Sequence, residues 1–249
     1  MINIVIPMAG HGSRFSKAGY TLPKPLIPVA GVPMIKGVIA NLTPQIPHRF
    51  IFICQAAHLE NYGLAENLRT WAKDCVILSV DCVTEGAACT VLLAEELIND
   101  QNPLMIANCD QYVDVDIDAY LKAQTGLSGL IMTMKADDPK WSFVRFDETG
   151  KITEVVEKEV VSDEATVGIY NFARGVDFVA AAKKMIAQNL RVKGEFYVAP
   201  VYNQMIAQGE TVGIYNIGTV NNGMYGLGTP EDLEVFLKLP MATVFAAAA

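Results

Sequence analysis

Apolar residues in the first half of the chain form unbroken runs of strand length, separated by segments in which they recur every three or four positions. Continuous apolar runs are typical of strands covered on both faces, and the wider spacing predicts amphipathic helices. The runs predict strands at residues 2–9, 49–55, 75–81, 103–110 and 128–136. The spaced segments predict helices at residues 33–42, 59–74, 85–98 and 116–124.

This alternation predicts an α/β fold, a three-layer arrangement with a mostly parallel sheet and helices on both of its faces. Ligands of such sheets bind beyond the carboxyl ends of the strands. A glycine-rich loop follows the first predicted strand, and Asn108-Cys109-Asp110 ends the fourth. We therefore expect the loop and this tripeptide to lie together at one rim of the sheet.

The pattern changes from about residue 138, where shorter strands become frequent. Residues 141–158 predict a hairpin around Glu148-Thr149-Gly150. Further strands are predicted at 165–173 and 211–218, and helices at 175–188, 195–209 and 229–238. In the last helix Thr229 is the expected N-cap and Pro230 the first helical residue.

We interpret this second half as a smaller β-rich lobe that completes the binding pocket. No linker, repeat or low-complexity segment divides the chain, so we expect a single domain over residues 1–245. Residues 1–135 would form its first half and residues 136–245 its second half. The alanine run at 246–249 has no evident role in a fold and is expected to be a tail.

Composition narrows the class of partner. The chain is 51% hydrophobic and 18% charged, as in globular proteins, and no apolar run reaches the ~18 residues of a membrane span. The start, MINIVIPMAG, lacks the basic region of a signal peptide, so we expect a cytoplasmic protein without a membrane partner. A net charge of −8 disfavours a nucleic-acid surface but leaves room for a small anionic ligand.

Cysteine and histidine give no metal signature. The five cysteines are an odd number without a Cys-x-x-Cys pair, so buried free thiols are expected, and the three histidines are scattered.

The loop Gly10-His11-Gly12-Ser13-Arg14 exposes backbone amides that could approach a phosphate closely. A dinucleotide fingerprint would need a third glycine, but position 15 is Phe. A Walker loop would end in Gly-Lys-Ser/Thr, but this loop ends in Ser-Arg-Phe. A loop for a mononucleoside triphosphate and a plain glycine turn both remain open on these residues alone.

Lys24 favours the first of these two alternatives. It lies between Pro23 and Pro25, which restrict the backbone and remove amide donors. A solvated surface lysine needs no such rigid frame. A single cation held near a glycine-rich anion site is typical of a phosphate clamp.

The stretch MAGHGSRFSKAGYTLPKPLIPVAGVPMI resembles the signature loop of the sugar-phosphate nucleotidyltransferases, Gly-x-Gly-x-Arg followed by Pro-Lys-Pro-Leu. The resemblance continues in family order through TEGAACTVLLA, LMIANCDQY, ITEVVEK, ATVGIYNF, GEFYVAPVYNQMI and LGTPEDLEVFL, and so covers nearly the whole chain. It implies a Rossmann-like fold and an enzyme that uses Mg²⁺. Such an enzyme transfers a nucleotidyl group from a nucleoside triphosphate to a small phosphorylated acceptor and releases pyrophosphate.

The resemblance also implies that residues 1–135 form a nucleotide-binding half and residues 136–245 an acceptor-binding half. Arg14 would hold the β- and γ-phosphates, Lys24 would neutralise charge where the α-phosphate meets the acceptor, and Asp110 would bind Mg²⁺. The remaining nucleotide-binding residues would be Ala9, Gly10, Gly12, Ser13, Thr84, Glu85, Gly86 and Asn108.

On the acceptor side, Glu157 and Lys158 face the acceptor in relatives, although such a pair can also be an ordinary exposed strand end. The complete implied set is Trp141, Glu157, Lys158, Gly168, Tyr170 and Glu195. Relatives are often dimers or tetramers, so the resemblance leaves a homo-oligomer open.

The sequence departs from the family pattern at two positions, and these departures limit which residue roles the resemblance implies for this chain. Many hexose-specific members have an aspartate that completes the metal site where this chain has Gly226. Asp110 would then act with substrate oxygens and waters, or another residue such as Asn222 or Asp232 would substitute. The second departure is Trp141, in place of the small residues that make room for a sugar.

The Trp-Ser variation resembles capsule-type members such as the CTP:phosphoglutamine cytidylyltransferases. The acceptor expected first is a sugar 1-phosphate, with a pyrimidine nucleotide (CTP, UTP or dTTP) as donor. The alternatives are a CTP-dependent enzyme for a phosphorylated non-sugar, of phosphoglutamine or phosphocholine type, in capsule polysaccharide biosynthesis, and a non-catalytic nucleotide-binding regulator.

Overall fold

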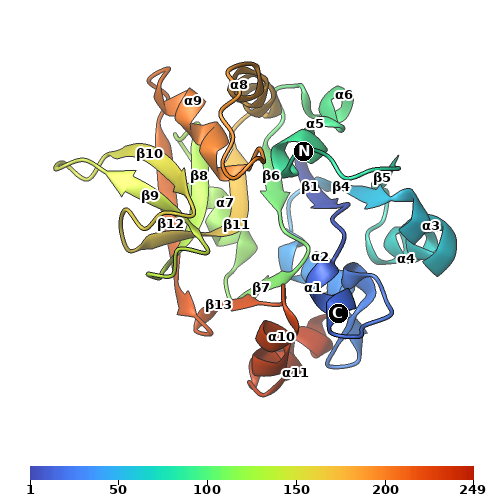
Figure 1. Ribbon diagram of the computed structural model, residues 1–249. Coiled ribbons are helices and arrows are strands. Elements are labelled where there is room, and N and C mark those ends of the chain that lie inside the picture. Colours follow the sequence, from blue (N-terminus) through green and yellow to red (C-terminus); the bar gives the residue numbers. More distant parts are fainter.

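The computed structural model describes residues 1–249 and has an eleven-stranded sheet with helices on both of its faces (Figure 1). The main path of the sheet runs β5-β4-β1-β6-β11-β8-β12-β13-β7, and the hairpin β9–β10 pairs with β11 beside this path. The strands are β1 (Ile2–Met8), β4 (His48–Gln55), β5 (Val76–Val80), β6 (Leu104–Ala107), β7 (Gln111–Val113), β8 (Gly129–Lys135), β9 (Ser142–Phe146), β10 (Ile152–Glu157), β11 (Glu164–Phe172), β12 (Val212–Val220) and β13 (Gly223–Gly226), with a small separate pair β2 (Pro28–Val29) and β3 (Val32–Pro33).

The helices follow the strands in alternation through the first half of the chain. They are α1 (Ser13–Lys17), α2 (Met34–Leu42), α3 (Ala56–Tyr62), α4 (Leu64–Trp71), α5 (Ala87–Leu92), α6 (Glu95–Ile98), α7 (Ile117–Ala123), α8 (Gly175–Ala187), α9 (Tyr202–Ile206), α10 (Pro230–Leu237) and α11 (Met241–Ala248), with short 3₁₀ turns η1 (Lys24–Leu26) and η2 (Ala199–Val201). The hairpin around residues 148–150 and the cap at Thr229, whose hydroxyl accepts from the Asp232 amide, are as predicted.

The three-layer arrangement is confirmed by how side chains alternate along the strands. In β1, Ile4 and Ile6 pack with α2, α4 and α7 on one face of the sheet. Val5, between them, packs with α5, α8 and α9 on the other face. Both cores consist of fully buried apolar side chains, which explains the continuous apolar runs in the sequence.

Strands β1, β4, β5 and β6 are parallel, with β1 pairing to β4 and to β6, and β4 pairing to β5. Strand β11 is antiparallel to both β6 and β8 and lies between them. One sheet therefore runs through both predicted halves of the chain, because a strand from the second half sits between two strands from the first.

Three predicted helices are wrong in length. Residues 59–74 form two helices that meet at Gly63, whose φ of 60° is the left-handed conformation that ends a helix. Residues 85–98 also form two helices, because the chain turns at Leu93 and Ala94 and brings Ile98 into the core. In 195–209 only η2 and α9 are helical, since Pro200 lacks an amide donor.

The chain end is also corrected, because residues 246–248 belong to α11 and not to a tail. Phe245 of this helix is 1% exposed and packs directly over Gly37 of α2. A Cβ atom at Gly37 would lie 1.9 Å from the Phe245 ring. Because Gly37 has no side chain, the last helix can pack closely against α2.

Candidate functional site

Three adjoining cavities lie where the strands β1 and β6 end, and all three are lined by Asn108. We call them the loop cavity, which Gly10 and Lys24 line, the acceptor cavity, which Glu157 and Lys158 line, and the third cavity, which Arg14 and Asp232 line. Asp110 lines the loop cavity and the third cavity, and Trp141 lines the acceptor cavity and the third cavity. The sequence prediction that the glycine loop and Asn108-Cys109-Asp110 share one rim is confirmed.

The loop cavity brings together Gly10, Gly12, Lys24, Asn108 and Asp110. Gly12 has a φ of 60° and begins α1, so its left-handed conformation suits glycine. A Cβ atom at Gly12 would lie 3.3 Å from the Cβ of Lys24, so the glycine also lets the lysine segment approach. The loop and the proline-framed lysine form one side of a single cavity.

Lys24 and Asp110 form an ion pair in which the Lys24 ammonium donates to Oδ2 of Asp110, and each side chain is 21% exposed. Burial acts to lower the pKa of Lys24, but the adjacent Asp110 carboxylate outweighs it and the pKa is raised. Gly228 leaves room for this pair, since a Cβ there would lie 2.7 Å from Oδ2 of Asp110. The pair holds a permanent positive charge against a carboxylate at the junction of the cavities.

The other residues of the loop are placed differently. Arg14 is exposed on the first turn of α1 and lines the third cavity, not the loop cavity. Ser13 is exposed at the start of the same helix and lines none of the three cavities. Ala9 is buried, and its carbonyl accepts a hydrogen bond of 2.7 Å from the side-chain amide of Gln55.

A loop outside the three cavities consists of Thr84, Glu85 and Gly86. It is held against the segment before η2 by main-chain contacts. The Phe196 amide donates to the Glu85 carbonyl at 2.8 Å. Gly86 has a φ of 133°, and a Cβ there would lie 2.4 Å from the Phe196 carbonyl oxygen. The next residue, Ala87, lines the acceptor cavity, so this loop adjoins the site without opening into it.

The acceptor cavity brings together five of the six predicted acceptor residues, namely Trp141, Glu157, Lys158, Gly168 and Tyr170. Glu195, the sixth, is exposed and does not line the cavity. A Cβ at Gly168 would lie 2.1 Å from Nδ2 of Asn108, so this glycine is what lets Asn108 reach the junction.

Charged and aromatic groups are paired within the acceptor cavity. Burial raises the pKa of Glu157, although a hydrogen bond from the Ser142 hydroxyl and the nearby Lys158 act to lower it. The Lys158 ammonium lies 4.4 Å from the centre of the Tyr197 ring and donates to its hydroxyl oxygen. Tyr197 was not predicted from the sequence, where only its place in the GEFYVAP stretch could have drawn attention to it.

The third cavity contains Gln111, which the sequence did not single out, and Asp232, which the sequence offered as a possible substitute for the missing second metal carboxylate. Gln111 begins β7 and is 4% exposed, and its Nε2 atom has no hydrogen-bond partner. Asp232 lies on the first turn of α10, on the far side of Gly226. A buried amide without a partner is a signal that only the structure provides.

The residues for a metal ion are limited but suitable. No group of three or more His, Cys, Asp or Glu side chains could hold an ion by itself. Mg²⁺ is commonly bound by one or two carboxylates together with substrate phosphates. Asp110 supplies one partly exposed carboxylate beside the loop cavity, so the donor set fits a magnesium ion that arrives with a nucleotide.

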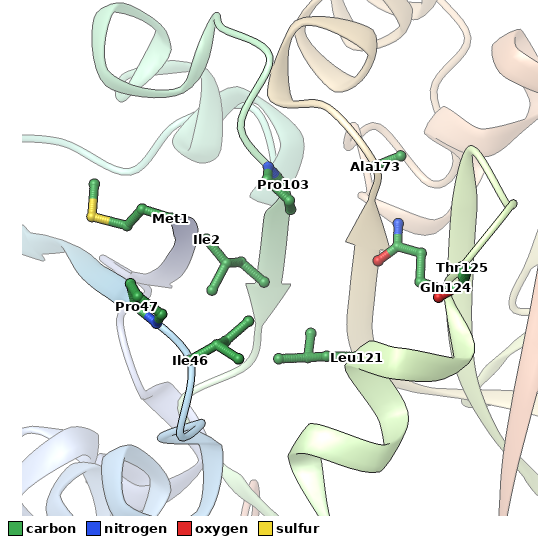
Figure 2. Close-up of a pocket in the computed structure, with 9 residues that line it drawn as sticks. All are labelled: Met1, Ile2, Ile46, Pro47, Pro103, Leu121, Gln124, Thr125 and Ala173. Atoms are coloured by element: carbon green, nitrogen blue, oxygen red, sulfur yellow. The ribbon is translucent and has the colours of Figure 1, made fainter.

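A separate apolar pocket lies at the opposite, amino ends of the strands, and its lining includes Met1, Ile2, Ile46, Pro47 and Leu121 (Figure 2). None of the predicted site residues lines it. It is thus distinct from the three cavities at the carboxyl ends.

The fold and this rim define an α/β protein with its candidate site at the carboxyl ends of the parallel strands β1 and β6. Residues 4–212 match the family model described as nucleotidyl transferase, and the chain belongs to this family of enzymes. No helix of the chain combines the length and apolar character that crossing a membrane requires.

Two curated relatives illustrate the similarity. The mannose-1-phosphate guanylyltransferase catalytic subunit beta of Danio rerio is 30% identical over 178 residues, which are 68% of this chain and 49% of that protein. The bifunctional protein GlmU of Exiguobacterium sibiricum is 26% identical over 227 residues, 86% of this chain and 48% of that protein. The chain therefore spans about half the length of these relatives.

Solved structures show the same fold over the whole chain. A nucleoside-diphosphate-sugar pyrophosphorylase from Vibrio cholerae RC9 has a TM-score of 0.82 at 26% identity, covering 95% of this chain and 100% of that one. The inositol-1-phosphate CTP transferase of T. maritima has a TM-score of 0.74 at 15% identity, covering 99% of this chain and 95% of that one, which is a likeness of fold alone.

Proposed function

We propose that the protein is a magnesium-dependent nucleotidyltransferase that moves a nucleoside monophosphate from a nucleoside triphosphate to a small phosphorylated acceptor. The observation that carries this proposal is the Lys24–Asp110 pair, in which Lys24 lines the loop cavity and Asp110 lines both the loop cavity and the third cavity. A cation and a carboxylate at that point suit a reaction in which two phosphates must meet. Family membership supports the same reaction class.

In this mechanism the protein positions charge and forms no covalent intermediate. An oxygen of the acceptor phosphate attacks the α-phosphorus in line, and the bond to the bridging oxygen of the leaving pyrophosphate breaks. Lys24 lowers the repulsion between the two phosphates, and Arg14, exposed in the third cavity, holds the outer phosphates. A magnesium ion held by Asp110 would neutralise further phosphate charge.

No general base is needed, because the acceptor phosphate is already deprotonated near neutral pH. The structure has a carboxylate in the acceptor cavity, Glu157, whose raised pKa and bond to Ser142 suit hydrogen bonding to the body of the acceptor. Lys158 and Tyr197 lie on the other side of the same cavity. We assign these three residues to acceptor binding.

The donor we propose is a pyrimidine nucleotide, CTP, UTP or dTTP, and the acceptor expected first is a sugar 1-phosphate. A phosphorylated non-sugar used with CTP, in cytoplasmic synthesis of a capsule polymer, is the alternative, and the Trp141 side chain between two cavities favours it. A non-catalytic nucleotide-binding regulator is the second alternative, favoured by Gly226 in place of a second carboxylate.

The experiment is pyrophosphate release measured in a grid of five nucleoside triphosphates against hexose 1-phosphates, phosphocholine and phosphoglutamine, with and without Mg²⁺. Release that requires Mg²⁺ and one nucleotide–acceptor pair is the expected result. Nucleotide binding without release for every pair would instead support the regulator.

A further inference from the structure

Arg191 lies outside the three cavities, in the segment that joins α8 to η2, and all three nitrogens of its guanidinium group have partners. Nε donates to Oδ1 of Asn189 at 2.7 Å, and Nη1 donates to the Gly194 carbonyl at 3.1 Å. Nη2 forms an ion pair of 3.1 Å with Oε2 of Glu85, which belongs to the Thr84–Gly86 loop. Contacts in three directions fix the plane of this guanidinium group.

The guanidinium group also lies over a buried ring. Its central carbon is 4.1 Å from the centre of the Phe196 ring, and Phe196 is 1% exposed. Arginine makes such planar contacts and a fork of hydrogen bonds at the same time, which the single ammonium of a lysine does not. The position therefore depends on arginine and not on positive charge alone.

The backbone that carries Arg191, which we call the 189–195 turn, needs such support. Asn189 and Lys193 have φ values of 52° and 48°, the left-handed conformation that is unfavourable for residues other than glycine. The Arg191 side chain bonds to Asn189 near one end of the turn and to Gly194 near the other. It thus stabilises a turn whose backbone is unfavourable by itself.

Two main-chain hydrogen bonds join the segment after this turn to the Thr84–Gly86 loop. The Phe196 amide donates to the Glu85 carbonyl at 2.8 Å, and the Ala88 amide donates to the Phe196 carbonyl at 3.0 Å. With the ion pair between Arg191 and Glu85 they make the turn and the loop one unit.

This unit forms one wall of the acceptor cavity. Ala87, next to the loop, and Tyr197, next to Phe196, both line the cavity. The Tyr197 hydroxyl accepts from the Lys158 ammonium, which lies 4.4 Å from the centre of the Tyr197 ring. A displacement of the unit would therefore separate Tyr197 from Lys158.

The 189–195 turn also lies near the buried carboxylate of the acceptor cavity. Burial raises the pKa of Glu157, and the charge of Glu195 acts to raise it further while that of Lys193 acts to lower it. Both side chains belong to the turn, so its position also sets the charge around Glu157.

We propose that Arg191 is a positioning residue for the acceptor. It holds the 189–195 turn and the Thr84–Gly86 loop in the one arrangement that places Tyr197 against Lys158, and it touches neither substrate itself. This rests on the proposed function, and it makes acceptor affinity depend on a residue outside the three cavities.

The kinetic test uses Arg191→Met with the nucleotide and acceptor that release pyrophosphate. We expect KM for the acceptor to rise at least about 10-fold while kcat stays within about 3-fold, because the cavity wall is displaced but the Lys24–Asp110 pair is not. Arg191→Lys should still raise KM at least about 5-fold, because an ammonium cannot replace the planar contacts. Arg174→Met removes an exposed arginine paired with Asp177 and should leave KM within about 2-fold.

Two kinetic results would overturn the proposal. Full recovery of KM in Arg191→Lys would mean that only the charge at this position matters. A lower kcat with unchanged KM in Arg191→Met would mean that Arg191 acts on the chemical step instead of on acceptor binding.

Amide hydrogen exchange tests the same unit in the free protein. The Ala88 and Phe196 amides should exchange at least about 10-fold faster in Arg191→Met, because the hydrogen bonds between turn and loop open more often. Arg174→Met should leave both rates unchanged. Faster exchange with a normal acceptor KM would also overturn the proposal, because Arg191 would then serve only the fold.

Exchange separates this proposal from the proposed function, since it needs no turnover. If the wild-type protein releases no pyrophosphate with any pair, the proposed function fails, but faster exchange at both amides still supports Arg191 as the residue that holds the cavity wall. Unchanged exchange at either amide refutes the proposal even in an active enzyme.

Discussion

At the scale of single residues, Lys24 depends on its neighbours for its position and its charge. Pro23 and Pro25 fix the backbone on either side, and Gly12 lets the lysine segment lie against the loop. Asp110 keeps the ammonium protonated despite burial. A preorganised cation of this kind stabilises charge without reorganising during the reaction, which is how charged groups accelerate phosphoryl transfer.

Replacing Lys24 or Asp110 should therefore affect turnover far more than folding. We expect Lys24→Met and Asp110→Asn each to lower kcat at least about 100-fold, the scale of losing one preorganised contact. Lys17→Met removes an exposed lysine of α1 and serves as the control. Circular dichroism checks the fold, and a folded variant with a near-normal rate would contradict the role assigned to that residue.

Glu157 should make stability depend on pH in a defined direction. Burial raises its pKa in the folded state, so the folded protein binds its proton more tightly than the unfolded chain does. Stability from this group is thus present below the unfolded pKa of about 4.3 and declines as the pH rises through the raised value. Glu157→Gln should melt at a higher temperature than the wild-type protein at pH 8, and the difference should shrink toward pH 5.

The control is Glu159→Gln, which neutralises an exposed carboxylate two residues further on. Its melting temperature should follow that of the wild-type protein across the same pH range. A Glu157→Gln advantage that grew toward acid pH would show that the sign of the shift is wrong.

At the scale of elements, the Thr84–Gly86 loop is held by main-chain contacts to Phe196, which only a glycine at position 86 allows. Since the motif that contains Gly86 implies contact with the nucleotide, Gly86→Ala should displace this loop and weaken binding of the nucleoside triphosphate at least about 10-fold, measured by calorimetry. Gly126→Ala is the matched control, because it also has a positive φ but meets nothing within 4 Å. That variant should show only backbone strain, about 1–2 kcal/mol in unfolding, with normal nucleotide affinity.

The last helix should contribute measurably to stability, although its final residues, 246–248, were predicted to belong to a tail. Phe245→Ala removes a fully buried ring that packs over Gly37, and it should lower the free energy of unfolding by about 3–5 kcal/mol. Val244→Ala, next to it and 49% exposed, should change it by less than about 0.5 kcal/mol. Urea unfolding of both variants gives the comparison, and equal effects would mean that α11 does not dock as described.

At the scale of the whole molecule, the sheet joins the two halves, since β11 lies between β6 and β8 (Figure 1). The parallel strands were predictable because continuous apolar runs mark strands covered on both faces. The order of the strands was not, since nothing local to residues 164–172 specifies two antiparallel neighbours that are distant in sequence.

The site was predictable to the extent that it lies in local motifs. The glycine loop, Lys24 and Asp110 each stand out in a short stretch, and the structure brings Lys24 and Asp110 together. Tyr197 does not, because its place in the site comes from the packing of its ring beside Lys158, which is distant in sequence. Glu195 was predicted from a motif to line the acceptor cavity, but it lies outside that cavity.

The central claim is that the α-phosphate, with its nucleoside, moves to the acceptor. The most direct measurement follows two labels, using triphosphate labelled at the α- or the γ-phosphorus with Mg²⁺ and the preferred acceptor. We predict that the α label appears in a new product joined to the acceptor phosphate and that the γ label appears in pyrophosphate, with both transfers lost in Lys24→Met. Release of the γ label as inorganic phosphate, with the α label remaining in a nucleoside diphosphate, would contradict nucleotidyl transfer.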